Sequence, residues 1–226
     1  MDNATLTQIE TNPVTRQHFV EKTSYQLHTR DTKGSVFLIT TVDVAPFIKE
    51  LEENEKADPT IWDQIERKNI AVQRETSALV LKRILLDADN DLVKVGTYNL
   101  AKPVTEYGDK FPALMKFASD FAQTQGGELS AIQLARIPAG HQVYRHYDKG
   151  KYYLLRDRYH LVLKSEGSRM VVNDVSVLWH QGEVWWFNNK QPHEAYNETG
   201  VERIHVIFDV ITDKMKMIEG ATNEND

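Results

Sequence analysis

Short apolar runs separated by turn-forming residues fill the chain from Ser130 onward. Gly, Pro or Asn occupies most of these turns, and no segment of helical periodicity lies between the runs. Many short strands at even spacing are typical of β-sandwiches and jelly rolls. The predicted strands are Ala131–Ile137, Arg158–Lys164, Ser168–Val172, Ser176–Trp179, Glu183–Asn188, Glu194–Asn197 and Glu202–Thr212, and the predicted turns include Pro138-Ala139-Gly140, Asp148-Lys149-Gly150, Glu166-Gly167, Gln181-Gly182, Asn188-Asn189 and Thr199-Gly200.

The first 130 residues combine strand and helix patterns. A β-branched run over Ser35–Val42 predicts a strand, and Asp43 then caps a helix that ends at Asp58-Pro59. Phe111–Ala122 carries apolar residues at helical spacing and is followed by Gly126-Gly127, which predicts a helix lying against the following sheet. Weaker patterns predict irregular structure over Met1–Gly34, a short helix over Thr60–Arg67, and strands over Thr76–Leu86 and Val93–Leu100.

The acidic segment Asp87–Asp91 begins like a calcium-binding loop. Leu92 stands where that loop needs Gly, and Tyr98 stands where it needs a bidentate Glu. A solvated acidic turn is therefore the better interpretation. The last residues, Lys214–Asp226, are polar with few apolar anchors, so we expect their end to fray.

With 226 residues, the chain is long enough for a single β-rich domain with a substantial core. We assign residues 1–130 to flanking helices and strands, residues 131–212 to the core, and residues 213–226 to a polar tail. The predicted fold class is mainly β, a cupin-like jelly roll with flanking elements at its N-terminal side.

The amino-acid composition limits which metal sites and which partners the chain can have. The chain has no Cys, which excludes disulfides, thiolate zinc sites and iron–sulfur clusters and leaves His nitrogen and carboxylate oxygen as metal ligands. Its net charge of -6, with basic residues scattered among acidic ones, gives no surface for a phosphate backbone, so nucleic acid is not an expected partner. Because no segment is apolar for long enough to cross a bilayer and residues 1–5 show no targeting pattern, we expect a soluble, cytoplasmic protein without a membrane partner.

His146 and Asp148 are the strongest candidates for metal ligands. They lie two residues apart in an extended segment, so their side chains point to the same side, and the Lys149-Gly150 turn leaves that end of the sheet open. His193 follows Pro192 at the start of a later strand, where an antiparallel neighbour can bring it to the same place. Two His and one carboxylate form the face that holds non-haem Fe(II). The three residues therefore predict a catalytic iron site.

Other interpretations of these residues stay open. His146 and Asp148 can form a hydrogen-bonded surface turn without any metal, since a lone His in a strand usually has an ordinary structural role. Glu194 is a second candidate carboxylate, although as the neighbour of His193 in a strand it should face the other way. A set of His, Asp and His leaves three octahedral positions open, which favours redox chemistry at iron over structural zinc with four ligands.

Two Arg-x-His pairs occupy predicted strands. Arg203 and His205 share one face of the last strong strand, and Arg158 and His160 repeat the arrangement in an earlier one. Arg is suited to a bidentate grip on a carboxylate, so Arg203 is the candidate for the distal carboxylate of a keto-acid cosubstrate. Four long polar side chains would be costly in an apolar core without partners, which predicts a polar interior. Either pair facing solvent in an amphipathic strand is the simpler alternative.

Aromatic residues lie on both sides of these candidates. Trp179, Trp185 and Trp186 surround Gly182, and we expect at least two of them to serve packing instead of substrate stacking. The tyrosines close to the first ligands are weaker candidates for the mouth or lid of a site, namely Tyr144, Tyr147, Tyr152 and Tyr153.

The sequence resembles the core of the aspartyl/asparaginyl β-hydroxylase family over about residues 131–212. The segments that carry this resemblance are Leu134–Gly140, His146–Gly150, Arg158–Leu163, Gly182–Asn189, His193–Asn197 and Arg203–Val210. The resemblance implies a double-stranded β-helix that uses Fe(II), 2-oxoglutarate and oxygen to hydroxylate an unactivated C–H bond, with release of succinate and carbon dioxide. The resemblance implies that His146 and His193 are the metal imidazoles. It also implies that Arg203 binds the side-chain carboxylate of 2-oxoglutarate, and that Arg158 and His160 line the cosubstrate pocket.

Asp148 departs from part of this family. The hydroxylases that name the family lack a ligating carboxylate, whereas Asp148 is present here and completes a conventional triad. The family also includes hydroxylases of free proline, so membership leaves both a free amino acid and a peptidyl side chain open as substrates.

Two other functions fit the same residues. A metal-dependent cupin enzyme without a keto-acid cosubstrate would use the same ligands but would form no succinate. A non-enzymatic jelly-roll binding module would use the His and Arg residues for hydrogen bonds and would bind its ligand without iron.

Overall fold

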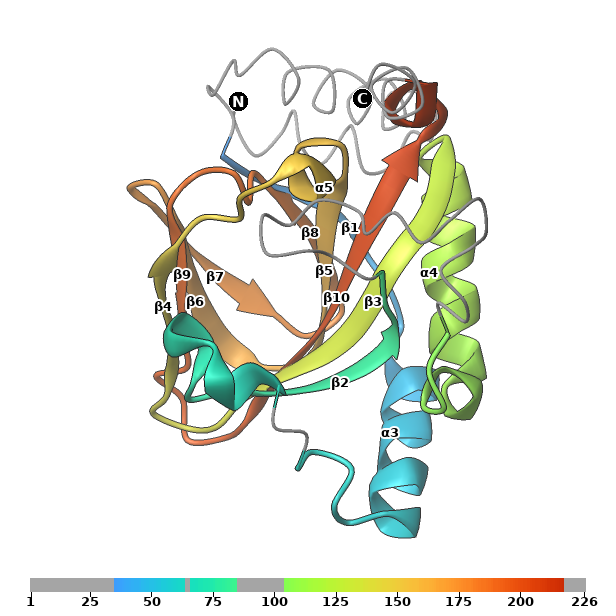
Figure 1. The fold of residues 1–226 in the computed structure, drawn as a ribbon. Coiled ribbons are helices and arrows are strands. Elements are labelled where there is room, and N and C mark those ends of the chain that lie inside the picture. Colours follow the sequence, from blue (N-terminus) through green and yellow to red (C-terminus); the bar gives the residue numbers. More distant parts are fainter. Residues whose placement is uncertain (1–34, 64–65, 85–103, 218–226) are drawn as a thin grey trace.

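The computed structural model describes residues 35–63, 66–84 and 104–217, and this part of the chain is mostly β (Figure 1). Its helices are α3 (Ala45–Ala57), α4 (Pro112–Thr124) and the short α5 (Lys151–Leu154), residues 213–217 are also helical, and there are 3-10 turns η1 (Glu66–Asn69), η2 (Ala71–Gln73) and η3 (Gly108–Lys110). Its strands are β1 (Val36–Thr41), β2 (Ser77–Lys82), β3 (Gly127–Ile137), β4 (Gln142–His146), β5 (Asp157–Lys164), β6 (Glu166–Val172), β7 (Val175–His180), β8 (Glu183–Phe187), β9 (His193–Tyr196) and β10 (Arg203–Thr212).

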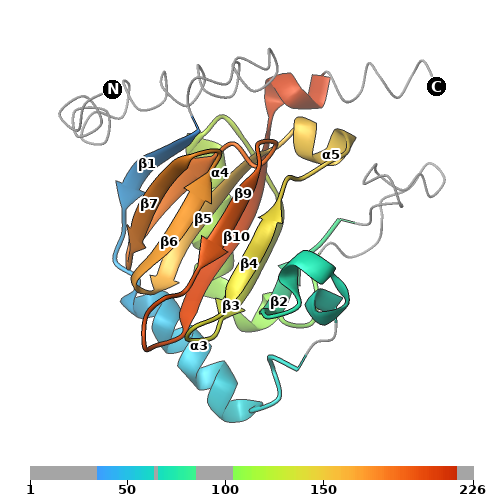
Figure 2. The same cartoon turned by 90° about the vertical axis from the view of Figure 1, so that its left-hand side faces the viewer.

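The strands form two antiparallel sheets. The larger sheet has the order β1-β8-β5-β10-β3-β2, and the smaller has the order β4-β9-β6-β7. Figure 1 shows the two sheets facing each other with α3 and α4 on the outer side of the large sheet, and Figure 2 shows the small sheet in front of that assembly. The predicted cupin-like jelly roll is therefore confirmed, as two sheets with a helical layer. Because β1 and β2 form the edges of the large sheet, the flanking region shares a sheet with the jelly-roll core.

Strand β10 separates two environments because its side chains alternate between the faces of the large sheet. One set belongs to the hydrophobic core on the helical side, namely Ile204, Val206, Phe208 and Val210. The alternate set points to the other face and begins with Arg203, His205 and Ile207, which line a cavity. The neighbouring strand β5 repeats this division, with Tyr159, Leu161 and Leu163 in the helical-side core and Arg158 and His160 at the cavity.

The helix α4 closes the core on the helical side. Phe121 meets Phe208 edge to face with ring centroids 5.3 Å apart, and it meets Tyr159 at 5.0 Å. The helix ends before Gly126, whose φ of 71° is a left-handed conformation that Gly adopts at little cost. Both the predicted helix and its position against the sheet are confirmed.

A second core lies between the two sheets. Trp179 and Trp185 stack there with ring centroids 5.4 Å apart and an interplanar angle of 8°. Trp186 instead belongs to the helical-side core and stacks on Phe37. All three tryptophans are therefore packing residues, as expected for at least two of them.

Several local predictions need correction. A short helix was expected over Thr60–Arg67, but the described part of it contains a turn and then η1, which starts at Glu66. Glu166-Gly167 was expected to be a turn, but it begins β6, where a register shift and the φ of 99° at Gly167 mark an irregularity. The sequence pattern also missed β4 and α5 as regular elements. Short elements such as these depend on tertiary pairing more than on local pattern.

Four predictions fall on other parts of the chain. Irregular structure over Met1–Gly34, the acidic turn at Asp87–Asp91, the strand over Val93–Leu100 and the end of the tail from residue 218 lie outside the described residues. Among the described residues, the helices are too short or too polar for any of them to cross a membrane.

Candidate functional site

A cavity of about 260 Å³ lies between the two sheets. Strands β2, β3, β5 and β10 supply one side of its lining, and β4, β6 and β9 supply much of the other. All seven candidate residues line it: His146, Asp148, Arg158, His160, His193, Arg203 and His205. Both Arg-x-His pairs therefore face the interior, and the alternative of a solvent-facing pair is wrong.

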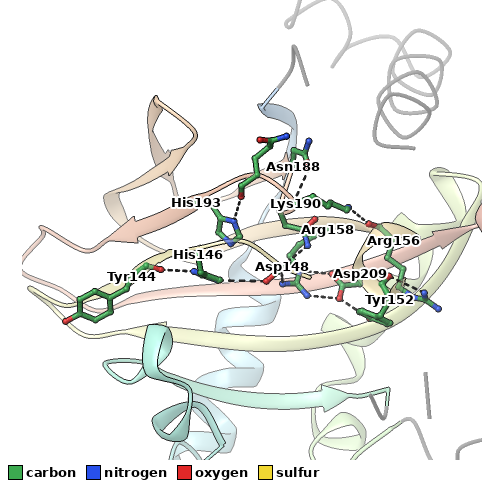
Figure 3. A network of polar contacts seen from close by, with 12 residues as sticks. Tyr144, His146, Asp148, Tyr152, Arg156, Arg158, Asn188, Lys190, His193 and Asp209 are labelled. Carbon is green, nitrogen blue, oxygen red and sulfur yellow. Dashed lines mark hydrogen bonds and ion pairs between the residues drawn. The ribbon is translucent and has the colours of Figure 1, made fainter. Parts of the chain in front are cut away.

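His146, Asp148 and His193 come together at this cavity (Figure 3). His146 ends β4 and pairs in register with His193, the first residue of the antiparallel strand β9. Their ring centroids lie 4.3 Å apart, and one ligand atom from each of the three residues lies within 4.8 Å of the others. The backbone N–H of Asp148 donates to the Asn189 carbonyl (2.9 Å), which holds the carboxylate beside the pair.

The hydrogen bonds of the two imidazoles determine which nitrogen is free. Nδ1 of His146 lies 2.7 Å from the Tyr144 carbonyl, and Nδ1 of His193 lies 2.9 Å from the Gln191 carbonyl. A carbonyl oxygen only accepts, so each Nδ1 carries a proton, and the neutral form of each ring has its lone pair on Nε2. This is the arrangement in which backbone carbonyls orient metal-binding histidines.

The two oxygens of Asp148 have different surroundings. Oδ2 accepts from the Arg158 guanidinium (2.7 Å) and from the Asn189 side-chain amide (2.7 Å). Oδ1 faces Nε2 of His146 at 3.9 Å. Arg158 is itself held by Asp209, whose two oxygens accept from its Nε and NH2 at 2.8 Å each. The network thus saturates one oxygen of Asp148 and leaves the other towards the imidazoles.

These contacts control protonation at the site. Burial raises the pKa of the Asp148 carboxyl, but the charge of Arg158, with His193 and the Asn189 hydrogen bond, outweighs burial and lowers the pKa below its usual value. Burial lowers the pKa of His193 to about 4 against the opposing charge of Asp148. Burial also lowers the pKa of Arg158, but Asp209 and Asp148 hold it well above its usual value. The site therefore presents a carboxylate and a neutral imidazole at neutral pH, the forms that bind metal.

Arg203 lies deep in the cavity and is 4% exposed. Its guanidinium contacts the His205 ring nitrogens at 2.7 and 2.8 Å, and its NH1 has no hydrogen-bond partner in the described part of the chain. Burial lowers the pKa of Arg203 to about 9, and the nearby charge of Arg67 adds to this effect. Nε2 of His160 is also buried without a partner there. This end of the cavity offers donors for an anionic group.

Glu194 and the four tyrosines proposed from the sequence lie outside the group of three potential metal ligands. Glu194 lines the cavity edge but pairs with Arg145 at 3.2 Å, away from the three-residue group. Tyr144 donates to Glu75, and among the four candidate tyrosines in the described chain only Tyr153 lines the cavity.

Three residues of the site were missed by sequence reasoning. Asp209 follows Arg203 and His205 at even spacing on the same strand, and this parity was a signal that could have identified it. Asn189 and Arg67 come from a turn and a 3-10 segment, and no periodic pattern marks either one.

The fold and the site together define a cupin-type jelly roll with a two-histidine, one-carboxylate group that could hold a metal ion. The donor set fits an octahedral ion with open positions, since both Nε2 atoms and one carboxylate oxygen are available on one side. Over residues 47–213 the sequence matches the profile of the family described as aspartyl/asparaginyl beta-hydroxylase. The chain belongs to this family, and this membership places it among hydroxylating oxygenases.

Solved structures that are similar to this chain match it at low identity. An oxidoreductase of the 2OG-Fe(II) oxygenase family from Burkholderia pseudomallei is 11% identical, with 75% of this chain and 90% of that chain covered and a TM-score of 0.43. A cupin-superfamily sugar phosphate isomerase from Silicibacter pomeroyi is 14% identical, with 65% of each chain covered and a TM-score of 0.34. A predicted oxalate decarboxylase from Thermotoga maritima is 14% identical, with 41% and 74% covered and a TM-score of 0.31. No curated protein matches the chain.

Proposed function

We propose that this protein is an Fe(II)- and 2-oxoglutarate-dependent dioxygenase that hydroxylates a C–H bond of an amino acid or of a peptidyl side chain. The observation that carries this proposal is the content of one cavity: three potential metal ligands together with a buried arginine that has no carboxylate partner among the described residues. Family membership supports the hydroxylase class.

In this proposal His146 and His193 hold iron through Nε2, and Asp148 holds it through Oδ1. Three ligands on one side leave octahedral positions for a chelating cosubstrate and for oxygen. When bound, iron would supply the activation of dioxygen: 2-oxoglutarate would be oxidised to succinate and carbon dioxide with one oxygen atom, and the other oxygen atom would form the hydroxyl group on the substrate carbon. The chain orients these groups and excludes water from them.

Arg203 anchors the distal carboxylate of 2-oxoglutarate in this proposal. Its unpartnered NH1 is a free donor, and a guanidinium grips a carboxylate in a bidentate geometry. The buried setting strengthens such an ion pair, because little water competes for either group. His205 and His160 lie beside the guanidinium and complete the polar end of the cavity.

The test is an anaerobic titration of the metal-free protein with Fe(II) and then with 2-oxoglutarate, followed through the visible charge-transfer band of the chelate. Wild type should show the band only after both additions. Arg203→Met should need about 10- to 100-fold more 2-oxoglutarate, because it removes a charge-assisted hydrogen bond. Arg136→Met is the matched control, since Arg136 lies on β3 beside Trp62 and Glu202, outside the cavity lining.

A wild-type protein without the band would contradict the proposal and favour a binding module or a cupin enzyme of another class. His146→Ala and His193→Ala should both lose Fe(II) binding, measured by metal content after gel filtration. Full Fe(II) binding by either variant would remove that residue from the ligand set.

A further inference from the structure

A third arginine, beside Arg158 and Arg203, lines the same cavity and comes from outside the sheets. Arg67 belongs to η1 and lines the cavity together with the three potential metal ligands. It is 7% exposed, and burial lowers its pKa to about 10. A cation this deeply buried is costly unless it meets an anion.

Arg67 has only an uncharged partner in the described part of the chain. Its NH1 donates to the Thr76 hydroxyl oxygen at 3.3 Å, a long hydrogen bond. That hydroxyl donates in turn to the Gln73 carbonyl at 2.7 Å. The ion pairs among the described residues leave Arg67 without a carboxylate, whereas Arg158 has two.

Among the described charged groups of the cavity, with metal and cosubstrate bound, only the positive charge of Arg67 has no negative charge to balance it. A divalent ion, the Asp148 carboxylate, a doubly charged 2-oxoglutarate and the Arg203 guanidinium together carry no net charge. Arg158 is balanced by Asp209. The loaded cavity would therefore keep one positive charge, on Arg67, and would attract one more anionic group.

We infer that Arg67 binds a carboxylate of the substrate, and that the substrate is a small carboxylic acid of about the size of an amino acid. This inference rests on the proposed function. The cavity of about 260 Å³ must hold the cosubstrate as well, which leaves space for a small molecule. Apolar side chains also line the cavity and suit the hydrocarbon part of such an acid, among them Val80, Val143 and Ile207.

The experiment compares matched pairs of probes on protein loaded anaerobically with Fe(II) and saturating 2-oxoglutarate. Each of the twenty L-amino acids, its carboxamide and acetylated acidic peptides are added in turn, and binding is measured as the shift in unfolding temperature with probe concentration. The variants are Arg67→Gln, Arg67→Lys and the control Arg74→Gln. Arg74 is exposed, lies over the Tyr144 ring and donates to the Ala71 carbonyl, so its loss leaves the cavity intact.

We expect at least one free acid to stabilise wild type and Arg74→Gln, while its amide gives no shift. Arg67→Gln should weaken the binding of that acid about 10- to 100-fold, and Arg67→Lys should retain part of it. In the charge-transfer titration, Arg67→Gln should leave the affinity for 2-oxoglutarate within about threefold of wild type.

Three outcomes would overturn the inference. Equal binding of acids and amides would show that no carboxylate is recognised. An Arg67→Gln variant that loses 2-oxoglutarate affinity as strongly as Arg203→Met would place Arg67 in the cosubstrate site. Arg67-dependent binding of acetylated acidic peptides, without binding of any free amino acid, would exclude a small substrate. Each of these three outcomes leaves the proposed function intact, whereas a wild type without the charge-transfer band would contradict the proposed function itself, so the two failures are distinguishable.

Discussion

The two Arg-x-His pairs are alike in sequence and differ in their surroundings. Arg158 and Arg203 lie on neighbouring antiparallel strands, and both reach the same cavity. Arg158 is neutralised by Asp148 and Asp209, whereas Arg203 has no carboxylate in the described part of the chain. The register of β5 against β10 explains this difference, because it sets Asp209 directly opposite Arg158. The same local pattern thus yields one arginine that organises the site and one that is free to bind a ligand.

The largest expected effect is on folding stability, from removal of the paired arginine. Arg158→Met should lower the free energy of unfolding by about 3–5 kcal/mol, because it leaves two buried carboxylates without their cation. Urea unfolding of the metal-free protein measures this loss. The double variant Arg158→Met/Asp209→Met should recover part of it, because only Asp148 is then left without its cation, and a single variant as stable as wild type would contradict the assignment.

Arg203→Met should affect ligand binding instead of stability. No buried carboxylate loses a partner there, so the free energy of unfolding should change by less than about 1.5 kcal/mol in either direction. Addition of 2-oxoglutarate to the Fe(II)-loaded protein without oxygen should stabilise wild type more than this variant at equal concentrations. A loss of stability as large as that of Arg158→Met would remove the contrast between the two arginines.

Acid should destabilise the metal-free protein through the buried histidines beside Arg203. Burial and the charge of Arg203 hold the pKa of His205 well below its usual 6.5, and the pKa of His160 is lowered in the same way. Below about pH 6.5 both histidines are protonated in the unfolded chain but stay neutral in the folded chain. The free energy of unfolding therefore falls as the pH falls, by about 1.4 kcal/mol per pH unit for each histidine.

Urea unfolding between pH 7.5 and pH 5 tests this dependence. His205→Gln should reduce the slope by about 1.4 kcal/mol per pH unit, because one such group is removed. His180→Gln, a change at an exposed position of β7, should leave the slope unaltered. An unchanged slope in His205→Gln would show that His205 is protonated without penalty in the folded protein.

The smallest expected effect lies at the outer end of the Arg158 network. Tyr152 donates from its hydroxyl to Oδ2 of Asp209 at 3.0 Å, so Tyr152→Phe should lower the free energy of unfolding by about 1 kcal/mol. Fe(II) affinity should stay within about threefold of wild type, because Arg158 still holds both carboxylates. Tyr147→Phe is the exposed control, and a Tyr152→Phe variant without Fe(II) affinity would extend the site to this residue.

Local pattern predicted the jelly roll, both long helices and the strands β5 and β10 that carry the Arg-x-His pairs, but it missed β4, which carries His146. Alternation along β5 and β10 also predicted which side chains share a face, because side chains of a strand alternate with a period of two. Spacing placed His146 and Asp148 on one side, and the structure brings both to His193. These features could be predicted because each depends on residues close together in the chain.

Only the tertiary structure determined which residues of the site lie next to one another. The pairing of β4 with β9 sets His146 opposite His193, and the pairing of β5 with β10 sets Arg158 opposite Asp209. Arg67 enters the cavity from a 3-10 segment that carries no periodic signal. Sequence therefore determined which side chains of β5 and β10 face inward, while strand register and loop packing, which join distant segments, determined which charges are neutralised and which stay free.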